Sequence, residues 1–322
     1  MCRILNGMWQ VSGGHGRIDA KAAVREMSDY VDAGFTTWDL ADHYGPAEDF
    51  IGEFKRRFAA ERGPASLDGV LAFTKWVPQP GKMTRRIVEE AVALSLRRMA
   101  VASLDLLQFH WWEYGDPSYL EALSHLAELQ AAGKIKRLGL TNFDTERVRR
   151  IIERGIPIVS NQVQYSLVDL RPAQQMAPYC QERGIKLLTY GTVCGGLLSE
   201  VWLGRPEPGH YELETVSQQK YQQMIEAWGG WPLFQDLLRA LKGVADKHRV
   251  SIANVGVRYM LDRPAVGGVI VGTRLGIAEH RADNARVFTL SLDAEDVRRI
   301  ESVCSKGRDL MQSIGDCGDE YR

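Results

Sequence analysis

Short apolar and β-branched stretches recur along the chain, and an amphipathic helical pattern follows each of them. These stretches predict eight β-strands, at residues 3–9, 36–39, 71–75, 104–110, 136–141, 158–164, 186–190 and 268–271. The first five begin roughly 30 residues apart, which is the length of a strand-helix-strand unit. Eight strands alternating with helices predict an α/β fold, a single closed (β/α)8 barrel of parallel strands.

Helix boundaries are marked between the strands. Leucines at four positions in 120–129 share one helical face, and the pattern stops at Gly133, a residue type that commonly ends helices. Asp144 is expected to cap the next helix and Gly155 to end it. Pro172 is expected to open another helix that runs to residue 183, because proline suits the first turn.

The interval between the last two strands is too long for one helix. Residues of about 200–231 are rich in glycine and proline and predict a long loop. Such a loop could be a functional lid or a mobile insertion without function, and both remain open. Helices are expected at about 232–248 and 251–261, and a capped helix begins near 292. All of residues 1–322 are therefore expected to form one domain.

Composition narrows the classes of protein. Hydrophobic residues make up 45% and charged residues 25%, which is typical of a globular chain, and 40 Lys+Arg against 41 Asp+Glu give a net charge of -1. That balance argues against nucleic acid or an anionic membrane as the main partner. No apolar stretch is long enough to span a bilayer, and the N-terminal residues lack the apolar core of a secretory signal. Five scattered cysteines without a C-x-x-C motif predict neither disulfides nor zinc, so we expect a cytoplasmic protein without metal.

Four polar residues follow three consecutive predicted strands, at the rim where parallel barrels place their catalytic groups. They are Asp39, Tyr44, Lys75 and His110. We expect Lys75 to lower the pKa of the Tyr44 phenol and Asp39 to hold Lys75. Tyr44 would then donate a proton to a carbonyl oxygen to which His110 also hydrogen-bonds.

Taken singly, each of these residues has a more ordinary explanation. Asp39 alone would be a turn or cap residue, Lys75 a solvated lysine, Tyr44 an aromatic at the edge of the core and His110 a hydrogen-bonded residue at a strand end. Their common position on one rim favours the catalytic interpretation. The neighbouring Asp42 and His43 are expected to serve as a capping residue and a cavity wall.

The chain resembles the aldo-keto reductase family over essentially its whole length. The stretch Trp-Asp-Leu-Ala-Asp-His-Tyr-Gly at 38–45 is similar to the family's Asp-Thr-Ala-x-x-Tyr-Gly segment, and Lys75 and His110 match its lysine and histidine. The segments 139–143 and 161–163 look like its Gly-Val-Ser-Asn-Phe and Asn-Gln strand ends. The resemblance implies that Thr141, Asn142, Gln162 and Tyr190 hold the nicotinamide of a bound cofactor.

The end of the eighth strand offers an anion site. Backbone N–H groups there precede a helix, and Arg274 adds a guanidinium suited to phosphate. The resemblance implies that the cofactor phosphates and adenine are bound in this region by Gly272, Thr273, Arg274, His280, Asp283 and Asn284. The segment 272–284 is two residues longer than the usual spacing, and the family's arginine falls at His280 or its neighbour Arg281. NADPH is the expected cofactor, with NADH possible.

Aromatic residues are frequent at or just beyond the strand ends. Trp9, Trp76, Trp111 and Trp112 are candidates for the substrate pocket, which favours an apolar or ring-bearing small-molecule carbonyl or alcohol. About half of such residues would instead pack helices on the barrel. The sequence specifies neither the substrate, nor the direction of reaction, nor the oligomeric state.

Motifs of metal hydrolases, serine hydrolases and Rossmann dehydrogenases do not occur in the chain. We therefore predict an NAD(P)H-dependent oxidoreductase that reduces an aldehyde or ketone to an alcohol, or catalyses the reverse. Two alternatives stay open. One is a nicotinamide-binding regulatory or sensor subunit with little turnover, and the other is a barrel lyase that forms a Schiff base at Lys75.

Overall fold

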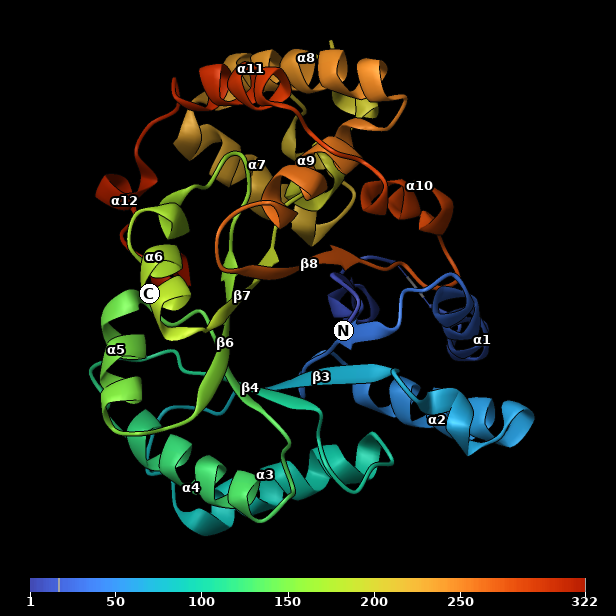
Figure 1. Cartoon of the computed structure of the whole chain (residues 1–322), viewed down its shortest axis with the longest axis vertical. Helices are drawn as coiled ribbons and strands as arrows, with labels where there is room; N and C mark the ends of the chain where they lie inside the picture. The colour runs from blue at the N-terminus through green and yellow to red at the C-terminus, as the bar shows by residue number, and fades with distance from the viewer. Residues whose placement is uncertain (17, 322) are drawn as a thin grey trace.

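A closed barrel of eight parallel strands forms the centre of the molecule (Figure 1). The structure is a computed structural model that describes residues 1–16 and 18–321. The strands follow one another around the barrel in chain order, and β1 pairs with β8 through Gly7 and Gly272 to close it. The strands are β1 Ile4–Gly7, β2 Thr37–Asp39, β3 Leu71–Trp76, β4 Leu106–His110, β5 Leu138–Thr141, β6 Ile158–Gln164, β7 Lys186–Tyr190 and β8 Val266–Gly272. The predicted (β/α)8 fold and all eight strands are confirmed.

Helices surround this barrel on the outside (Figure 1). The α-helices are α1 Ala20–Asp32, α2 Ala47–Arg62, α3 Arg85–Arg98, α4 Tyr119–Ala131, α5 Thr145–Glu153, α6 Met176–Arg183, α7 Val216–Trp228, α8 Gly230–His248, α9 Ile252–Leu261, α10 Arg281–Ala285, α11 Ala294–Cys304 and α12 Leu310–Ser313. Short 3-10 turns are η1 Trp9–Ser12, η2 Pro64–Leu67, η3 Arg171–Ala173, η4 Cys194–Gly196, η5 Glu200–Trp202, η6 His210–Glu212, η7 Arg286–Phe288 and η8 Asp319–Tyr321. Within the described ranges, no helix has the length and apolar character needed to cross a membrane.

Local side-chain chemistry sets several of these boundaries. Asp144 accepts a hydrogen bond of 2.7 Å from the backbone N–H of Arg147 and caps α5 as predicted. Gly133 follows α4 at φ 76°, a left-handed conformation that glycine adopts without a Cβ clash. Pro172 lies in η3 rather than in a helix, and α6 begins only at Met176, so the helix start predicted at Pro172 is wrong. The two helical segments are separated because Gln175 leaves helical geometry at φ -132°.

The segment 200–231 differs from the loop that its composition predicts. It contains two 3-10 turns and the 13-residue helix α7. A capping box starts α7, because the Thr215 hydroxyl accepts from the N–H of Gln218 while the Gln218 side chain accepts from the N–H of Thr215. Tyr221, Met224 and Ile225 bury one face of α7 and give it a tertiary role. The expectation of a long loop is therefore corrected: α7 lies against α8 and η4 at the edge of the barrel.

Two apolar layers hold the barrel together. A small cluster of Leu5, Phe73, Leu106 and Leu188 fills its interior, and a much larger layer lies between the strands and the surrounding helices. Apolar packing thus occupies the inside of the barrel at these levels. The polar strand residues concentrate toward the carboxyl ends, where the candidate site lies.

Candidate active site

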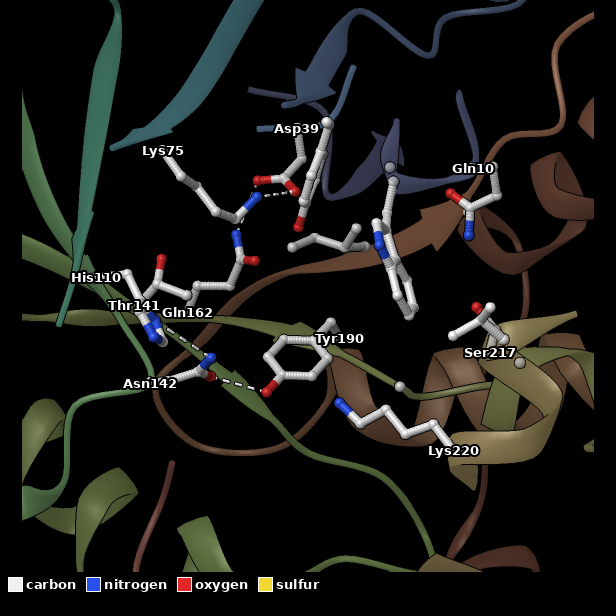
Figure 2. Close-up of a pocket in the computed structure, with 18 of the residues that line it drawn as sticks. Gln10, Asp39, Lys75, His110, Thr141, Asn142, Gln162, Tyr190, Ser217 and Lys220 are labelled. Atoms are coloured by element: carbon white, nitrogen blue, oxygen red, sulfur yellow. Dashed lines mark hydrogen bonds and ion pairs between the residues drawn. The ribbon is translucent and has the colours of Figure 1, made fainter. Parts of the chain in front are cut away.

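A buried ion pair joins the ends of two neighbouring strands. Lys75 of β3 donates to Asp39 Oδ2 of β2 over 2.6 Å and to the carbonyl oxygen of Leu40 over 2.8 Å (Figure 2). The residues Asp39 and Lys75 are only 3% and 2% exposed. Burial lowers the pKa of the Lys75 ammonium, whereas the Asp39 carboxylate opposes that effect. The predicted pairing of these two residues is present.

Two glutamines complete the surroundings of Asp39. Its second oxygen accepts from Gln108 Nε2 at 3.0 Å and from Gln162 Nε2 at 2.8 Å. The sequence analysis did not select Gln108, although its position contained a usable indication. Gln108 precedes His110 by two residues in β4, so the two side chains share one face of the strand.

Tyr44 lies in the turn after β2, directly beside the ion pair. The Lys75 ammonium is 4.8 Å from the centre of the Tyr44 ring. Burial raises the pKa of the Tyr44 phenol, and the charges of Asp39 and Asp42 raise it further. The net shift is therefore upward, and burial with the two carboxylates outweighs the lowering that was expected from Lys75.

His110 at the end of β4 contacts a second group of polar residues. Its Nδ1 lies 3.5 Å from Asn142 Nδ2, and Asn142 Oδ1 accepts 2.8 Å from the hydroxyl of Tyr190 (Figure 2). Asn142 has a φ of 57°, a left-handed conformation that asparagine tolerates better than most residues. The carboxyl ends of β4, β5 and β7 therefore meet at one place.

These groups line one cavity of about 380 Å³ at the carboxyl rim of the barrel. All four predicted catalytic residues contribute to its wall, as do Trp9, Trp112 and His43. Trp76 and Trp111 do not line it. Trp76 packs on Phe109, and the Trp111 indole donates to backbone carbonyl groups of the loop that follows it. These two tryptophans are buried in the packing between barrel and helices, so the expectation that they line the substrate pocket is corrected.

All four residues predicted to hold the nicotinamide also border the cavity. They are Thr141, Asn142, Gln162 and Tyr190, and Gly272 borders it from β8. The Thr141 hydroxyl oxygen is buried and has no hydrogen-bond partner among the described residues, so it can serve a ligand. A Cβ at Gly272 would lie 2.2 Å from the Gln10 side chain, and glycine keeps this part of the cavity open. These features fit a nicotinamide cofactor.

Two of the residues predicted to hold the phosphates form hydrogen bonds with other residues of the chain. Thr273 donates its hydroxyl to the carbonyl oxygen of Gly7 over 2.8 Å. Arg274 donates to the carbonyl oxygen of His15 over 3.2 Å, which aims it at the loop after β1. His280 is exposed and precedes α10, and Asn284 lies within α10.

Two further residues near α10 are paired. Asp283 accepts from Ser251 Oγ at 2.7 Å and from Asn254 Nδ2 at 3.2 Å, which links α10 to α9. Arg281 contacts three carboxylates, those of Glu26, Asp29 and Glu279. Arg281 is therefore less available to a phosphate than the sequence suggested.

Several residues that line the cavity lie outside the strand ends and were not predicted, among them Lys220 and Tyr321. Lys220 enters from α7, and Tyr321 enters from η8 near the end of the chain. A rule that considers only strand ends cannot find them, because their position depends on how α7 and η8 pack over the rim.

Comparison with known proteins gives the family of the chain. The sequence model of the Aldo/keto reductase family matches residues 3–305. The chain belongs to the aldo/keto reductase family. The family assignment supports an oxidoreductase that acts on carbonyl compounds.

Relatives of this aldo/keto reductase are found among bacteria and algae. It is 28% identical to the aldo-keto reductase YhdN of Bacillus subtilis over 84% of this chain and 81% of that one. It is 29% identical to the flagellar radial spoke protein 5 of Chlamydomonas reinhardtii over 74% of this chain, but the match spans only 56% of that relative. The glycerol dehydrogenase AKR11B4 of Gluconobacter oxydans has the same fold, with a TM-score of 0.78 at 22% identity over 95% of this chain and 92% of that one.

Proposed function

We propose that this aldo/keto reductase reduces an aldehyde or ketone to an alcohol, or catalyses the reverse, by direct hydride transfer with Tyr44 as the general acid. The buried Asp39–Lys75 pair next to Tyr44, on a cavity that His110 also lines, is the observation that carries the proposal. A small-molecule carbonyl fits a cavity of this size.

Four residues on the cavity wall support a nicotinamide dinucleotide as the cofactor. Thr141 and Asn142 would bind its carboxamide, Gln162 would assist them, and the Tyr190 ring would support its nicotinamide face. When bound, the cofactor supplies the hydride that the carbonyl carbon receives. The unpaired Thr141 hydroxyl supports this assignment, since a buried polar atom without a protein partner is costly unless a ligand satisfies it.

Tyr44 would donate its hydroxyl proton to the carbonyl oxygen as that oxygen gains negative charge. The raised pKa of the phenol keeps Tyr44 protonated, so the acid form is present before the reaction. The Lys75 ammonium beside the ring would stabilise the phenolate that remains, and Asp39 would hold Lys75 in place. His110 would orient the same carbonyl oxygen by a hydrogen bond.

Replacement of Tyr44 tests this mechanism. In Tyr44→Phe we expect kcat for aldehyde reduction to fall by about 100- to 10,000-fold, the range for the loss of a general acid. Cofactor affinity, measured by fluorescence titration, should stay close to that of the unmodified protein because the ring is kept. A variant with unaltered kcat would exclude Tyr44 as the acid.

NADPH is the cofactor that we expect, with NADH possible. Arg274 supports NADPH because its guanidinium could bind a ribose phosphate, whereas Arg281 is already held by three carboxylates. Steady-state measurement of KM for both cofactors tests this preference. A lower KM for NADPH that rises selectively in Arg274→Met would support it, and a strong preference for NADH would contradict it.

A further inference from the structure

Lys220 presents a second cation to the cavity, and it differs from Lys75 in its surroundings. Its ammonium lies 5.0 Å from the ring centre of Tyr190 and 4.5 Å from that of Tyr321, and it donates to the Tyr321 hydroxyl. Figure 2 shows the side chain extending from α7 toward Tyr190. No carboxylate of the described residues forms an ion pair with Lys220, whereas Lys75 is paired with Asp39.

Glu320, an acidic residue next to Tyr321 in the chain, is paired with an arginine. Its Oε2 accepts from the buried guanidinium of Arg171 at 3.0 Å. Its Oε1 lies 3.4 Å from the Tyr190 hydroxyl. Glu320 is thus paired with Arg171, which also binds Asp169 and holds the backbone near Tyr321 through the carbonyl oxygen of Asp316.

The Lys220 ammonium consequently has donor hydrogens that can bind a ligand. An ammonium group has three donor hydrogens, and the Tyr321 hydroxyl takes one of them. Aromatic rings stabilise a cation without neutralising it. A charge held in this way on a cavity wall attracts an anionic ligand group, which would gain a charge-assisted hydrogen bond.

The position of Lys220 relates it to the reacting end of the cavity. Tyr190 contacts Lys220 on one side and, through its hydroxyl, Asn142 on the other, and Asn142 neighbours His110. A second connection runs through Tyr321, which meets the Trp112 ring at 6.1 Å, while Trp112 meets His110 at 4.3 Å. A molecule whose carbonyl group lies at Tyr44 and His110 can thus extend along this wall toward Lys220.

We propose that Lys220, together with the Tyr321 hydroxyl, forms an anion subsite that selects carbonyl substrates with a carboxylate or phosphate group remote from the carbonyl. This proposal rests on the carbonyl reduction proposed above. The contribution of Lys220 is specificity rather than chemistry, because Tyr44 remains the proton donor. The helix α7 therefore supplies a determinant of the substrate class.

Pairs of one anionic and one neutral aldehyde test the subsite. The carboxylate arm compares 4-carboxybenzaldehyde with 4-nitrobenzaldehyde, and the phosphate arm compares glyceraldehyde 3-phosphate with glyceraldehyde. In Lys220→Met we expect kcat/KM for the anionic member of at least one pair to fall by about 10- to 100-fold, as for a lost charge-assisted hydrogen bond. The neutral members should be unaffected, and the arm that responds identifies the anion.

Two variants serve as controls. Lys220→Arg should retain most of the preference because it keeps a cation at the same place. Lys186→Met removes the same charge from the exposed start of β7, at the opposite end of the barrel. It should leave kcat/KM unchanged for all four aldehydes. Equal losses for neutral and anionic substrates in Lys220→Met would overturn the proposal. A weaker affinity for the cofactor alone would overturn it as well, because Lys220 would then serve the cofactor.

A binding measurement separates this proposal from the proposed function. Calorimetric titration of the NADP⁺-loaded protein with 4-carboxybenzyl alcohol and with benzyl alcohol should give tighter binding of the anionic alcohol, and Lys220→Met should abolish the difference. Selective binding without turnover of any aldehyde would support the subsite and contradict the reductase. Turnover without any preference for anionic ligands would contradict the subsite alone.

Discussion

At the scale of single residues, the Asp39–Lys75 pair dominates the site. Removing both charges from water is costly, and the 2.6 Å contact together with hydrogen bonds from Gln108 and Gln162 offsets that cost. Such a pair is weak evidence for stability in itself. Its geometry is explained better by the position that it gives to the Lys75 ammonium beside Tyr44.

Lys75→Met tests both the structural and the functional side of this pair. We expect the free energy of unfolding to fall by about 3–5 kcal/mol, because Asp39 would remain as a buried charge without a cation. Turnover should fall as well, since no cation would stabilise the phenolate of Tyr44. Urea denaturation and kcat measure the two effects.

The double variant Asp39→Asn/Lys75→Met provides the matched control. It should regain part of the lost stability, because no unpaired charge remains, but it should not regain turnover. If Lys75→Met alone were as stable as the unmodified protein, the pair would not be buried as described.

Side-chain alternation explains which tryptophans the sequence could have assigned correctly. Neighbouring residues along a strand point to opposite faces. Lys75 faces the cavity, so the next residue, Trp76, faces the helices. In the same way His110 faces the cavity and Trp111 faces the helices. Trp112, two residues after His110, lies on the same side as His110. The same alternation along the sequence separates Trp112 from the two tryptophans that pack under the helices.

At the scale of elements, charged contacts join the helices at the outside of the barrel. Asp293 caps α11 through the N–H groups of Glu295 and Asp296, and it pairs with Lys247 at the end of α8 over 2.5 Å. Asp296 also accepts from Lys247 and from His248. The end of α8 is thereby tied to the beginning of α11, which Figure 1 shows lying side by side.

The Asp293 cap predicts a specific pH dependence of stability. The Lys247 contact lowers the pKa of Asp293 to about 2 from its usual 3.8. A lowered folded-state pKa means that the stabilisation is present above the unfolded-state pKa and is lost as the pH falls from about 4 through about 2. The melting temperature of Asp293→Asn should therefore lie below that of the unmodified protein at pH 6, and the gap should narrow in this acidic window.

Lys247→Met is the control for this dependence. This variant should have a lower melting temperature than the unmodified protein at pH 6. In the Lys247→Met background, the difference in melting temperature caused by Asp293→Asn should depend less on pH, because the partner that shifts the Asp293 pKa is removed. A gap that stays constant from pH 6 to pH 2 would contradict the assigned pair.

At the scale of the whole molecule, a buried arginine connects the C-terminal segment to the barrel. Arg171 binds Asp169 through two hydrogen bonds of 2.8 Å, binds Glu320 and donates to the carbonyl oxygen of Asp316. Burial lowers the pKa of Arg171, but the carboxylates of Asp169 and Glu320 raise it above its usual value, so the guanidinium stays charged. The network holds η8 against the rim and places Tyr321 in the cavity wall.

Arg171→Met should release this segment. We expect a loss of about 3–5 kcal/mol in the free energy of unfolding, because Asp169 would keep a buried charge without its arginine. Amide hydrogen exchange at residues 315–321 should become faster than in the unmodified protein. Arg183→Met, an exposed arginine at the end of α6, should change neither measurement, and unchanged exchange in Arg171→Met would refute the anchor.

The sequence by itself determined the barrel, its eight strands and the four polar residues at its rim. These features depend on local periodicity and on chain order, because a parallel barrel brings successive strand ends together wherever their helices lie. The sequence also places Gln108 on the cavity side of β4, because Gln108 shares a strand face with His110.

Only the tertiary structure decided the remainder. The helix α7, the pairing of Arg281 with three carboxylates and the entry of Lys220 and Tyr321 into the cavity all depend on contacts between segments far apart in the chain. Such contacts leave no periodic trace in the sequence, because they depend on how α7 and η8 pack over the rim. The raised pKa of Tyr44 has the same origin, since burial is a property of the assembled fold.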